Sequence, residues 1–243
     1  MEQLRKSAIQ LGIELSDEQI NKFQKYYEML IETNKVMNLT AITGKEEVIL
    51  KHFVDSISIV KVLPDMIKYI DSDNISIKIL DLGTGAGFPG IPLKIVFPAI
   101  DIVLLDSLNK RINFLNSVID ELKLSGINAI HGRAEEMARN KEYREKFDLC
   151  VSRAVANLST LSEYCLPFIK VNGKFISYKA SEIEEEVDNA GNALKILGGN
   201  LTTVKKITLP ESDIERSFVI IDKAKNTPKT YPRKAGTASR NPL

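Results

Sequence analysis

The feature that most constrains this chain is a glycine-rich turn between an apolar segment and a helical one. Residues 79–90 read ILDLGTGAGFPG, so a short apolar strand passes an acidic residue and meets glycines at alternate positions. Glycine is needed where the backbone takes a positive φ or where a ligand approaches the main chain closely. The helix that follows directs its free N–H groups toward whatever the turn holds. The turn therefore predicts an α/β fold with a bound small ligand.

Two ligands are compatible with this turn. The pattern G-x-G-x-x-G at residues 85–90 is typical of dinucleotide-binding turns, but Asp81 would then lie beside a pyrophosphate of like charge. The alternative pattern D-x-G-x-G-x-G uses Asp81, Gly83, Gly85 and Gly87. It suits S-adenosylmethionine, because the ammonium and sulfonium groups of that molecule are cations.

A second acidic residue supports an adenosine ligand. Asp106 ends the next apolar segment, about 20 residues after the turn, where a carboxylate hydrogen-bonds a ribose diol. NAD and S-adenosylmethionine both carry this diol, so Asp106 does not distinguish between them.

Residues 77–222 alternate between strand and helix patterns. Strands are predicted near 77–82, 101–106, 127–131, 147–151 and 174–179, and helices near 88–97, 108–124, 156–169 and 183–197. The alternation predicts right-handed crossovers and a parallel sheet. Residues 200–209 and 215–222 predict an antiparallel hairpin at the sheet edge. This Rossmann-like α/β layout is that of class I S-adenosylmethionine-dependent methyltransferases, and nothing about a dehydrogenase calls for the hairpin.

The two ends of the chain differ from this central domain. Residues 1–76 are predicted to form a helical extension, with helices at 3–11, from a capping box at Ser16 to about Met37, and at 46–63. Residues 223–243 contain Lys and Arg without any acidic residue and are predicted to be a mobile or draped basic tail. Such a tail neutralises phosphates or simply favours solubility, and its composition does not decide between these roles.

Composition narrows the class of protein further. The chain is 44% apolar and 27% charged, with a formal net charge of +1, which is ordinary for a soluble globular protein. No run reaches the roughly 18 apolar residues of a membrane span, and the charged start is not a signal peptide. Cys150 and Cys165 lack metal-site spacing. We expect a cytoplasmic protein without a metal, and nothing in the sequence predicts an obligate dimer, so we expect a monomer.

Over nearly its full length the chain resembles the bacterial glucose-inhibited division protein B family of small-subunit ribosomal RNA methyltransferases. The matching segments are 34–42 (NKVMNLTAI), 52–56 (HFVDS), 80–93 (LDLGTGAGFPGIPL), 106–107 with 110–111, 132–136 (GRAEE), 147–148 with 152–154 (SRA), 178–179, 231–236 (YPRKAG) and 242–243. One departure is Ala180, where the family usually has glycine. This difference leaves the local backbone conformation undecided and does not affect the expected activity.

The resemblance implies transfer of the methyl group of S-adenosylmethionine to N7 of a guanine in 16S ribosomal RNA, either as naked RNA or in the small subunit. The glycines of the turn would then cradle the cofactor, with Phe88 closing over it. Ala134 and Glu135 would contact the adenine from just after the third strand.

Arg153 is the main catalytic candidate. It follows the fourth strand, at the edge where open α/β sheets place their ligands. Methyltransferases that act on exocyclic amines usually have an N/D-P-P-Y/F motif there, whereas N7 of guanine is a lone pair and releases no proton. An arginine fork at this position suits guanine acceptors or phosphate, and the resemblance also implies contact with the cofactor. Asn38 is a second candidate for substrate contact, with a helix C-cap as its alternative role.

A group of basic residues is expected to hold RNA phosphates around the site. These are Lys110, Arg133 and Lys179 at the pocket mouth and Arg233 and Lys234 in the tail. His52 and His131 are interpreted as structural residues rather than as bases.

Other functions are less consistent with the sequence. A cytosine-C5 methyltransferase needs a nucleophilic cysteine, and Cys150 lies within a strand without the Pro-Cys context. A non-catalytic RNA-binding module would not need an intact cofactor turn, and a small-molecule methyltransferase has no use for the basic tail. An S-adenosylmethionine methyltransferase with another substrate, or, on weaker grounds, an NAD-dependent oxidoreductase, stays open.

Overall fold

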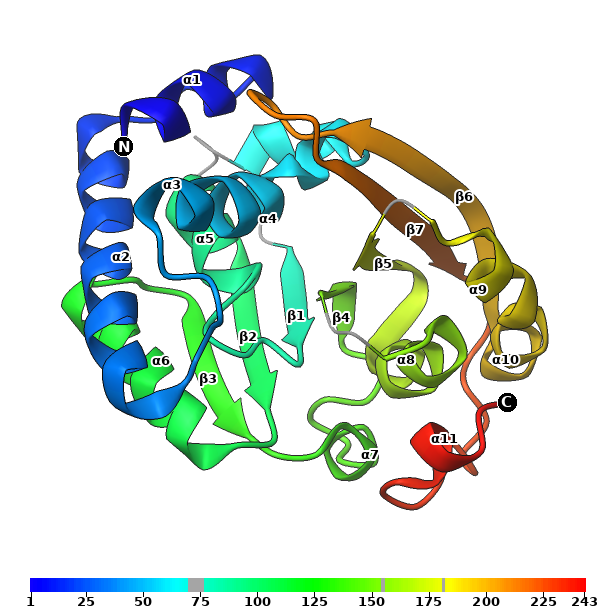
Figure 1. Ribbon diagram of the computed structural model, residues 1–243. Coiled ribbons are helices and arrows are strands. Elements are labelled where there is room, and N and C mark those ends of the chain that lie inside the picture. Colours follow the sequence, from blue (N-terminus) through cyan, green and yellow to red (C-terminus); the bar gives the residue numbers. More distant parts are fainter. Residues whose placement is uncertain (70–76, 154–155, 181) are drawn as a thin grey trace.

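A seven-stranded sheet forms the centre of the molecule (Figure 1). The computed structural model describes residues 1–69, 77–153, 156–180 and 182–243. The strands are β1 (Lys78–Leu82), β2 (Asp101–Asp106), β3 (Ile127–His131), β4 (Phe147–Ser152), β5 (Ile169–Lys179), β6 (Gly199–Thr208) and β7 (Glu215–Lys223), in the order β3-β2-β1-β4-β5-β7-β6. The first five strands are parallel, and β7 is antiparallel to β5 and β6. The predicted class I fold, with its hairpin at the sheet edge, is confirmed.

Helices follow each parallel strand and also precede the sheet. Before the sheet lie α1 (Glu2–Gln10), α2 (Asp17–Met37), α3 (Lys45–Val48), the π-helix η1 (Ile49–Val54), α4 (Asp55–Ile57) and the 3₁₀ helices η2 (Ser58–Lys61) and η3 (Pro64–Tyr69). Within and after it lie α5 (Gly90–Val96), α6 (Asn109–Glu121), α7 (Ala134–Met137), α8 (Leu158–Cys165), η4 (Leu166–Phe168), α9 (Glu184–Asn189), α10 (Gly191–Leu197) and α11 (Thr237–Arg240). No helix in the described part of the chain is long and apolar enough to cross a membrane.

Alternate residues of the strands face two apolar cores. On β1, Ile79 joins a core with α1, α2, α5 and α6, while Leu80 and Leu82 join a core with α8 and α10. This is the side-chain alternation expected of a strand that is covered on both faces. Figure 1 shows α2 beside α6, and α8 with α10 near β5 and β6. Because Phe23 and Phe53 share the first core with Ile79, the helical extension packs directly onto the sheet.

The N-terminal helices match the sequence prediction except in one segment. Ser16 and Gln19 form the predicted capping box, and Asn38 is the C-cap of α2 in a left-handed conformation with φ 48°. The single helix predicted over 46–63 is instead a succession of α, π and 3₁₀ turns that ends at Lys61. Turns of π geometry inside helices are frequent at functional sites, and this one presents His52 to the end of β4. The predicted boundary at residue 76 falls in 70–76, outside the described residues.

The C-terminal segment is packed against the protein. Lys223, predicted as the first basic residue of the tail, is the last residue of β7, and its buried Nζ donates to the Leu166 carbonyl and to Thr227 Oγ1. Arg144 donates to the carbonyls of Thr227 and Tyr231. Of the two predicted states of the tail, the structure therefore has the draped one.

Candidate active site

Four neighbouring strands deliver the predicted site residues to one edge of the sheet. β1 ends after Asp81 and Leu82, and β2 ends at Asp106, which is in register with His131 at the end of β3. β4 ends at Ser152, immediately before Arg153. The carboxyl edge of an open α/β sheet is where such folds bind ligands.

The first pocket at this edge has a volume of about 440 Å³. It is lined by Leu82, Gly83, Leu105, Asp106, Ser107, Arg111, Gly132, Arg133, Ala134, Glu135, Ala156, Leu161 and Tyr164. Four predicted cofactor residues (Gly83, Asp106, Ala134 and Glu135) thus come together. Ser107 and Tyr164 were not singled out as site residues. Ser107 could have been indicated by the family segment 106–107, whereas Tyr164 had only its position within a predicted helix.

Asp81 lies buried beneath the glycine turn. Its Oδ2 accepts hydrogen bonds from Thr84 Oγ1 at 2.6 Å and from the Gly90 backbone N–H at 2.8 Å. Its Oδ1 is also buried and has no hydrogen-bond partner in the described structure. Burial raises the pKa of Asp81 to about 7, although the two hydrogen bonds oppose this shift. The carboxylate thus braces the turn with one oxygen, and the other is a buried acceptor beneath the turn.

The glycines of the turn have different tasks. Gly83, Gly85 and Gly87 all have positive φ, of 73°, 62° and 104°. A Cβ on Gly87 would lie 2.7 Å from the Tyr26 hydroxyl, whereas a Cβ on Gly85 would meet nothing within 4 Å. Gly87 therefore permits close packing on α2, and Gly85 leaves open space for a ligand.

Phe88 lies in an aromatic cluster on the side of the N-terminal helices. Its ring stacks on His52, with centroids 4.5 Å apart, and lies near Tyr26 and Phe53. Because Phe88 is buried there and does not line the first pocket, the predicted role of closing over the cofactor is corrected. Tyr26, which the sequence did not single out, donates to the Ala86 carbonyl and so connects α2 with the turn.

Asp106 fixes the same turn from the second strand. Its Oδ2 accepts from the Gly85 N–H at 2.9 Å and from Arg111 at 3.2 Å, and its Oδ1 accepts from the Leu108 N–H at 2.9 Å. The carboxylate is buried at the pocket wall. It is thereby held in one orientation at the place predicted for a ribose diol.

The C-terminal segment packs against a residue that lines this pocket. Glu135 Oε1 accepts from the Gly236 N–H at 2.9 Å, and Thr160 Oγ1 donates to the Ala238 carbonyl at 3.0 Å. Arg233 donates to both oxygens of Glu163, which is 1% exposed. We therefore correct the sequence interpretation of Arg233, because its side chain holds the tail on α8 and is not free for a phosphate.

Replacing Arg233 by alanine is expected to lower the free energy of unfolding by about 3 kcal/mol, because it leaves the Glu163 carboxylate buried without its partner. Lys234→Ala is the matched control, since Lys234 is exposed and its replacement should change that free energy by no more than about 0.5 kcal/mol. Urea unfolding of the two variants checks this. Equal stabilities would show that the pair contributes little to the fold.

A second pocket, of about 520 Å³, lies at the ends of β4 and β5. It is lined by Ile42, Lys51, His52, Asp55, Arg153, Tyr178, Lys179, Ala180, Glu182, Ile183, Glu186 and Arg216. Lys179 donates to the carbonyl of Ala156, which lines the first pocket, at 2.6 Å. The two pockets are therefore neighbours at the carboxyl edge of the sheet.

Arg153 is held by the π-helical turn rather than projecting freely. Its Nη1 donates to the Lys51 carbonyl at 2.9 Å and to Asp55 Oδ2 at 3.0 Å, and its Nη2 lies 3.1 Å from His52 Nδ1. These contacts engage three of the five N–H groups of a guanidinium. The Cζ atom of Arg153 lies over the Phe88 ring, 5.1 Å from the ring centroid, which is a cation–π distance. Of the family segment at 152–154, Ala154 lies outside the described residues.

The sequence interpretation did not connect two of the partners of Arg153 with it, since it gave His52 only a structural role and did not single out Asp55. Asp55 is buried and also accepts from Arg216 Nε at 3.0 Å, so it joins two arginines. Burial and the nearby guanidinium lower the pKa of His52 to about 3. His52 Nδ1 lies 3.1 Å from both Arg153 Nη2 and the Lys51 carbonyl, and Nε2 lies 2.9 Å from Thr40 Oγ1. The only available signal was the segment 52–56, where these residues stand three apart on a helix.

The remaining candidates are placed as follows. Lys110 and Arg133 are exposed at the starts of α6 and α7, and Lys234 is exposed in the tail. Asn38 is exposed at the end of α2 and does not line either pocket. Lys179 is only 9% exposed and pairs with Glu186 at 2.6 Å, so we correct its predicted place on an open cationic rim. Cys150 is buried in β4, and burial raises the pKa of its thiol, which disfavours a nucleophilic thiolate.

Comparison with known proteins identifies the family. A sequence profile described as rRNA small subunit methyltransferase G matches residues 19–217. The chain belongs to this family. The ribosomal RNA small subunit methyltransferase G of Lachnoclostridium phytofermentans is 52% identical and covers 96% of this chain and 93% of its own. That of Streptococcus agalactiae is 51% identical, with 97% and 96% covered. Membership of the methyltransferase G family confirms the resemblance found in the sequence and disfavours an oxidoreductase.

Solved structures support the fold only. MtNAS in complex with MTA and tNA has a TM-score of 0.54 at 14% identity, over 91% of this chain and 75% of that chain. The CMeT domain of the citrinin polyketide synthase has a TM-score of 0.52 at 14% identity, over 70% and 52%. Both agree with the class I fold of the methyltransferase G family.

Proposed function

We propose that this chain transfers the methyl group of S-adenosylmethionine to N7 of a guanine in 16S ribosomal RNA. The observation that carries the proposal is the pair of adjoining pockets at the carboxyl edge. The first is lined by Gly83 of the glycine turn and by two carboxylates, and the second by two arginines and a neutral histidine. The name shared by the relatives supports ribosomal RNA as the substrate.

The first pocket and the glycine turn beside it suit S-adenosylmethionine on three observations. Gly83 is exposed at its wall, the Cβ position of Gly85 faces open space, and Asp81 Oδ1 is a buried acceptor without a partner. A cationic ligand would compensate that buried carboxylate. Asp106 and Glu135 would hold the ribose and the adenine. When bound, the cofactor supplies an electrophilic methyl group on a sulfonium.

The protein's task is then mainly to position the base. N7 of guanine carries a lone pair, so no residue has to remove a proton, and the low pKa of His52 agrees with a site that lacks a general base. Orienting two reactants contributes roughly 7–11 kcal/mol in favourable cases. The fixed guanidinium of Arg153, in the second pocket and over the Phe88 ring, is suited to hold the base in line.

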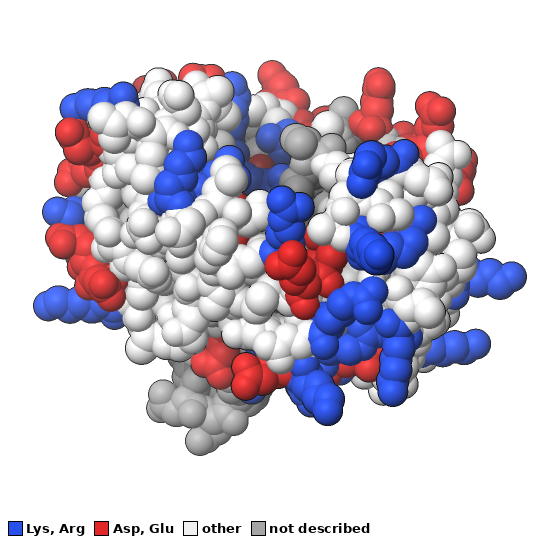
Figure 2. All heavy atoms as spheres, turned by 90° about the horizontal axis from the view of Figure 1, so that it is seen from below, with Lys and Arg blue, Asp and Glu red and all other residues white. Residues whose placement is uncertain are grey.

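RNA is expected to approach over a basic surface beside the first pocket. This basic surface consists of Arg133, Arg139, Lys229, Lys234 and Arg240, all exposed. Arg139 donates to the Pro232 carbonyl at 2.5 Å, which joins the segment after α7 to the tail. Figure 2 shows Lys and Arg side chains gathered on this face of the molecule where α7 and the C-terminal segment lie. Clustered cations of this kind bind phosphates and make affinity depend on salt.

The deciding experiment is methyl transfer from labelled S-adenosylmethionine to small ribosomal subunits that lack the modification, followed by identification of the labelled nucleoside. The expected product is N7-methylguanosine, and the label should be lost with Asp81→Ala. Cofactor binding without labelling of RNA would place the substrate elsewhere. No cofactor binding at all would overturn the interpretation of the first pocket.

A further inference from the structure

We propose that Lys179 and Glu186, the proposed reader pair, recognise the target base and select guanine by hydrogen bonds to its Watson–Crick edge. This inference rests on the proposed transfer to guanine and names the residues that determine that specificity. Both side chains line the second pocket, where Lys179 follows Tyr178 in β5 and Glu186 lies on α9.

The pair is built into the pocket rather than formed on an open surface. Lys179 is 9% exposed and Glu186 is 28% exposed. Lys179 Nζ donates to Glu186 Oε1 and to the Ala156 carbonyl, both at 2.6 Å. The Ala156 contact anchors the ammonium group beside the first pocket, which we assign to the cofactor.

The pair keeps unused hydrogen-bonding capacity of both kinds. An ammonium has three N–H donors, and two of those on Lys179 are engaged. Glu186 Oε2 has no partner among the described residues, and a carboxylate accepts at both oxygens. The second pocket therefore presents a donor directly next to an acceptor.

This order of groups is complementary to guanine. The Watson–Crick edge of guanine carries the O6 acceptor next to the N1–H and 2-amino donors, so Lys179 matches O6 and Glu186 matches the two donors. Adenine carries an amino donor and a ring acceptor in the reverse order and would meet both side chains unfavourably. Extruded bases are commonly selected at this edge. N7 lies on the other edge of the purine, so recognition here leaves it free to face the methyl donor.

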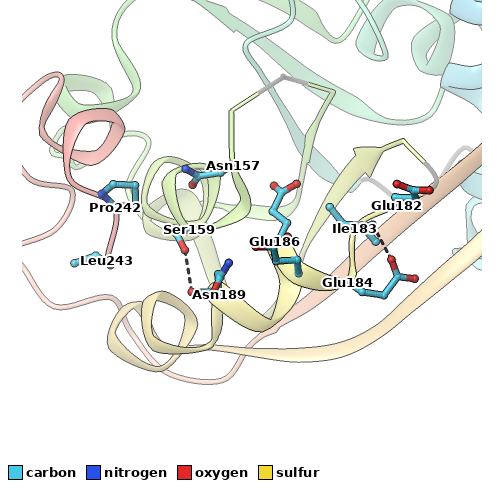
Figure 3. A pocket seen from close by; sticks show the side chains of 10 residues that line it. Asn157, Ser159, Glu182, Ile183, Glu184, Glu186, Asn189, Pro242 and Leu243 are labelled. Atoms are coloured by element: carbon cyan, nitrogen blue, oxygen red, sulfur yellow. Dashed lines mark hydrogen bonds between the residues drawn. The ribbon is translucent and has the colours of Figure 1, made fainter.

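Neighbouring glutamates supply a matched control. Glu182, Glu184, Glu185 and Glu186 all line an adjoining acidic pocket of about 900 Å³, seen in Figure 3. In that view the carboxylate of Glu186 points away from that of Glu184, which pairs with Lys206. Glu185 is exposed and does not line the second pocket. Replacing Glu185 therefore changes the same charge on the same short helix without touching the proposed reader pair.

The test measures kcat/KM on small subunits reconstituted with guanosine or inosine at the modified position, because inosine lacks only the 2-amino group. The wild type should prefer guanosine by roughly 5- to 150-fold, since one good contact to a base is worth about 1–3 kcal/mol. Glu186→Gln should lose a similar factor on guanosine and show a much smaller preference, because one neutral amide oxygen replaces two carboxylate acceptors. Glu185→Gln should behave like the wild type, and both variants should bind S-adenosylmethionine normally.

Two outcomes would overturn the inference. One is a Glu186→Gln variant that keeps its preference for guanosine while losing activity on both substrates, which is the behaviour of a purely structural residue. The other is a wild type that methylates guanosine and inosine equally well. Failure of the proposed function is distinct, because the wild type would then label no guanine at all.

Discussion

Replacing Asp81 by asparagine is expected to weaken the binding of S-adenosylmethionine about 10- to 100-fold, because a hydrogen bond to a charged group contributes about 1.5–3 kcal/mol. Asparagine keeps an acceptor for Thr84 and for the Gly90 N–H, so the glycine turn should keep its form. The substitution removes the negative charge of the carboxylate, including that on Oδ1, the buried atom without a hydrogen-bond partner. The loss should therefore appear in cofactor affinity and not in folding.

The wild-type affinity should also depend on pH. Because the pKa of Asp81 is raised to about 7 in the free protein, the carboxyl group is protonated at lower pH and must lose its proton to meet a cation. This costs about 1.36 kcal/mol per pH unit below 7, so affinity should fall up to tenfold per unit as the pH decreases. The stability of the protein without cofactor should change with pH in the opposite direction. The folded state holds a proton between pH 3.8 and about 7 that the unfolded chain has released, so this group makes stability fall as pH rises through that window.

Calorimetric titration with the cofactor from pH 5.5 to 7.5 checks the expected effects of Asp81→Asn and of pH on cofactor affinity. This range is suitable because the α-amino group of the cofactor keeps its proton until about pH 8. The wild type should bind more tightly as pH rises and should release a proton on binding. Asp81→Asn should give a flat profile. Asp120→Asn, at an exposed position on α6, is the control and should follow the wild type. A wild-type profile that is flat as well would mean that Oδ1 does not meet the cation.

The parts of the site that the sequence predicts well are those fixed by strand order. Asp81 and Asp106 stand at the ends of apolar strands, and parallel strands bring such ends to one edge whatever the loops do. The hairpin of β6 and β7 was also predictable, because a short loop allows only an antiparallel pair.

The partners of charged residues were not predictable in this way. Arg233 meets Glu163 across 70 residues, and Arg153 meets Asp55 across 98. Nothing in the composition of a basic segment tells a paired arginine from a free one, because pairing depends on how distant elements pack. The π-helical turn of η1 was likewise hidden, since its apolar spacing resembles that of an ordinary helix. Phe88 was assigned to the cofactor because it follows the glycines, although its ring packs on His52.

Replacing Arg153 by alanine is expected to lower kcat/KM for the RNA substrate by about 10²-fold while leaving the affinity for S-adenosylmethionine nearly unchanged. Arg153 lines the second pocket and not the first, and a small misplacement of a bound group costs that much in rate. Asp55 keeps its contact with Arg216 in this variant, so the fold should survive.

The contacts of Arg153 also predict which replacements fail to restore activity. Arg153→Lys should be nearly as impaired as the alanine variant, because one ammonium does not reproduce a planar fork that reaches Lys51, His52 and Asp55 together. Steady-state kinetics on small subunits and calorimetry with the cofactor separate the two effects. If Arg153→Ala lost cofactor affinity as strongly as it lost kcat/KM, Arg153 would belong to the cofactor site instead. If Arg153→Lys were fully active, charge alone and not the orientation of the fork would hold the substrate.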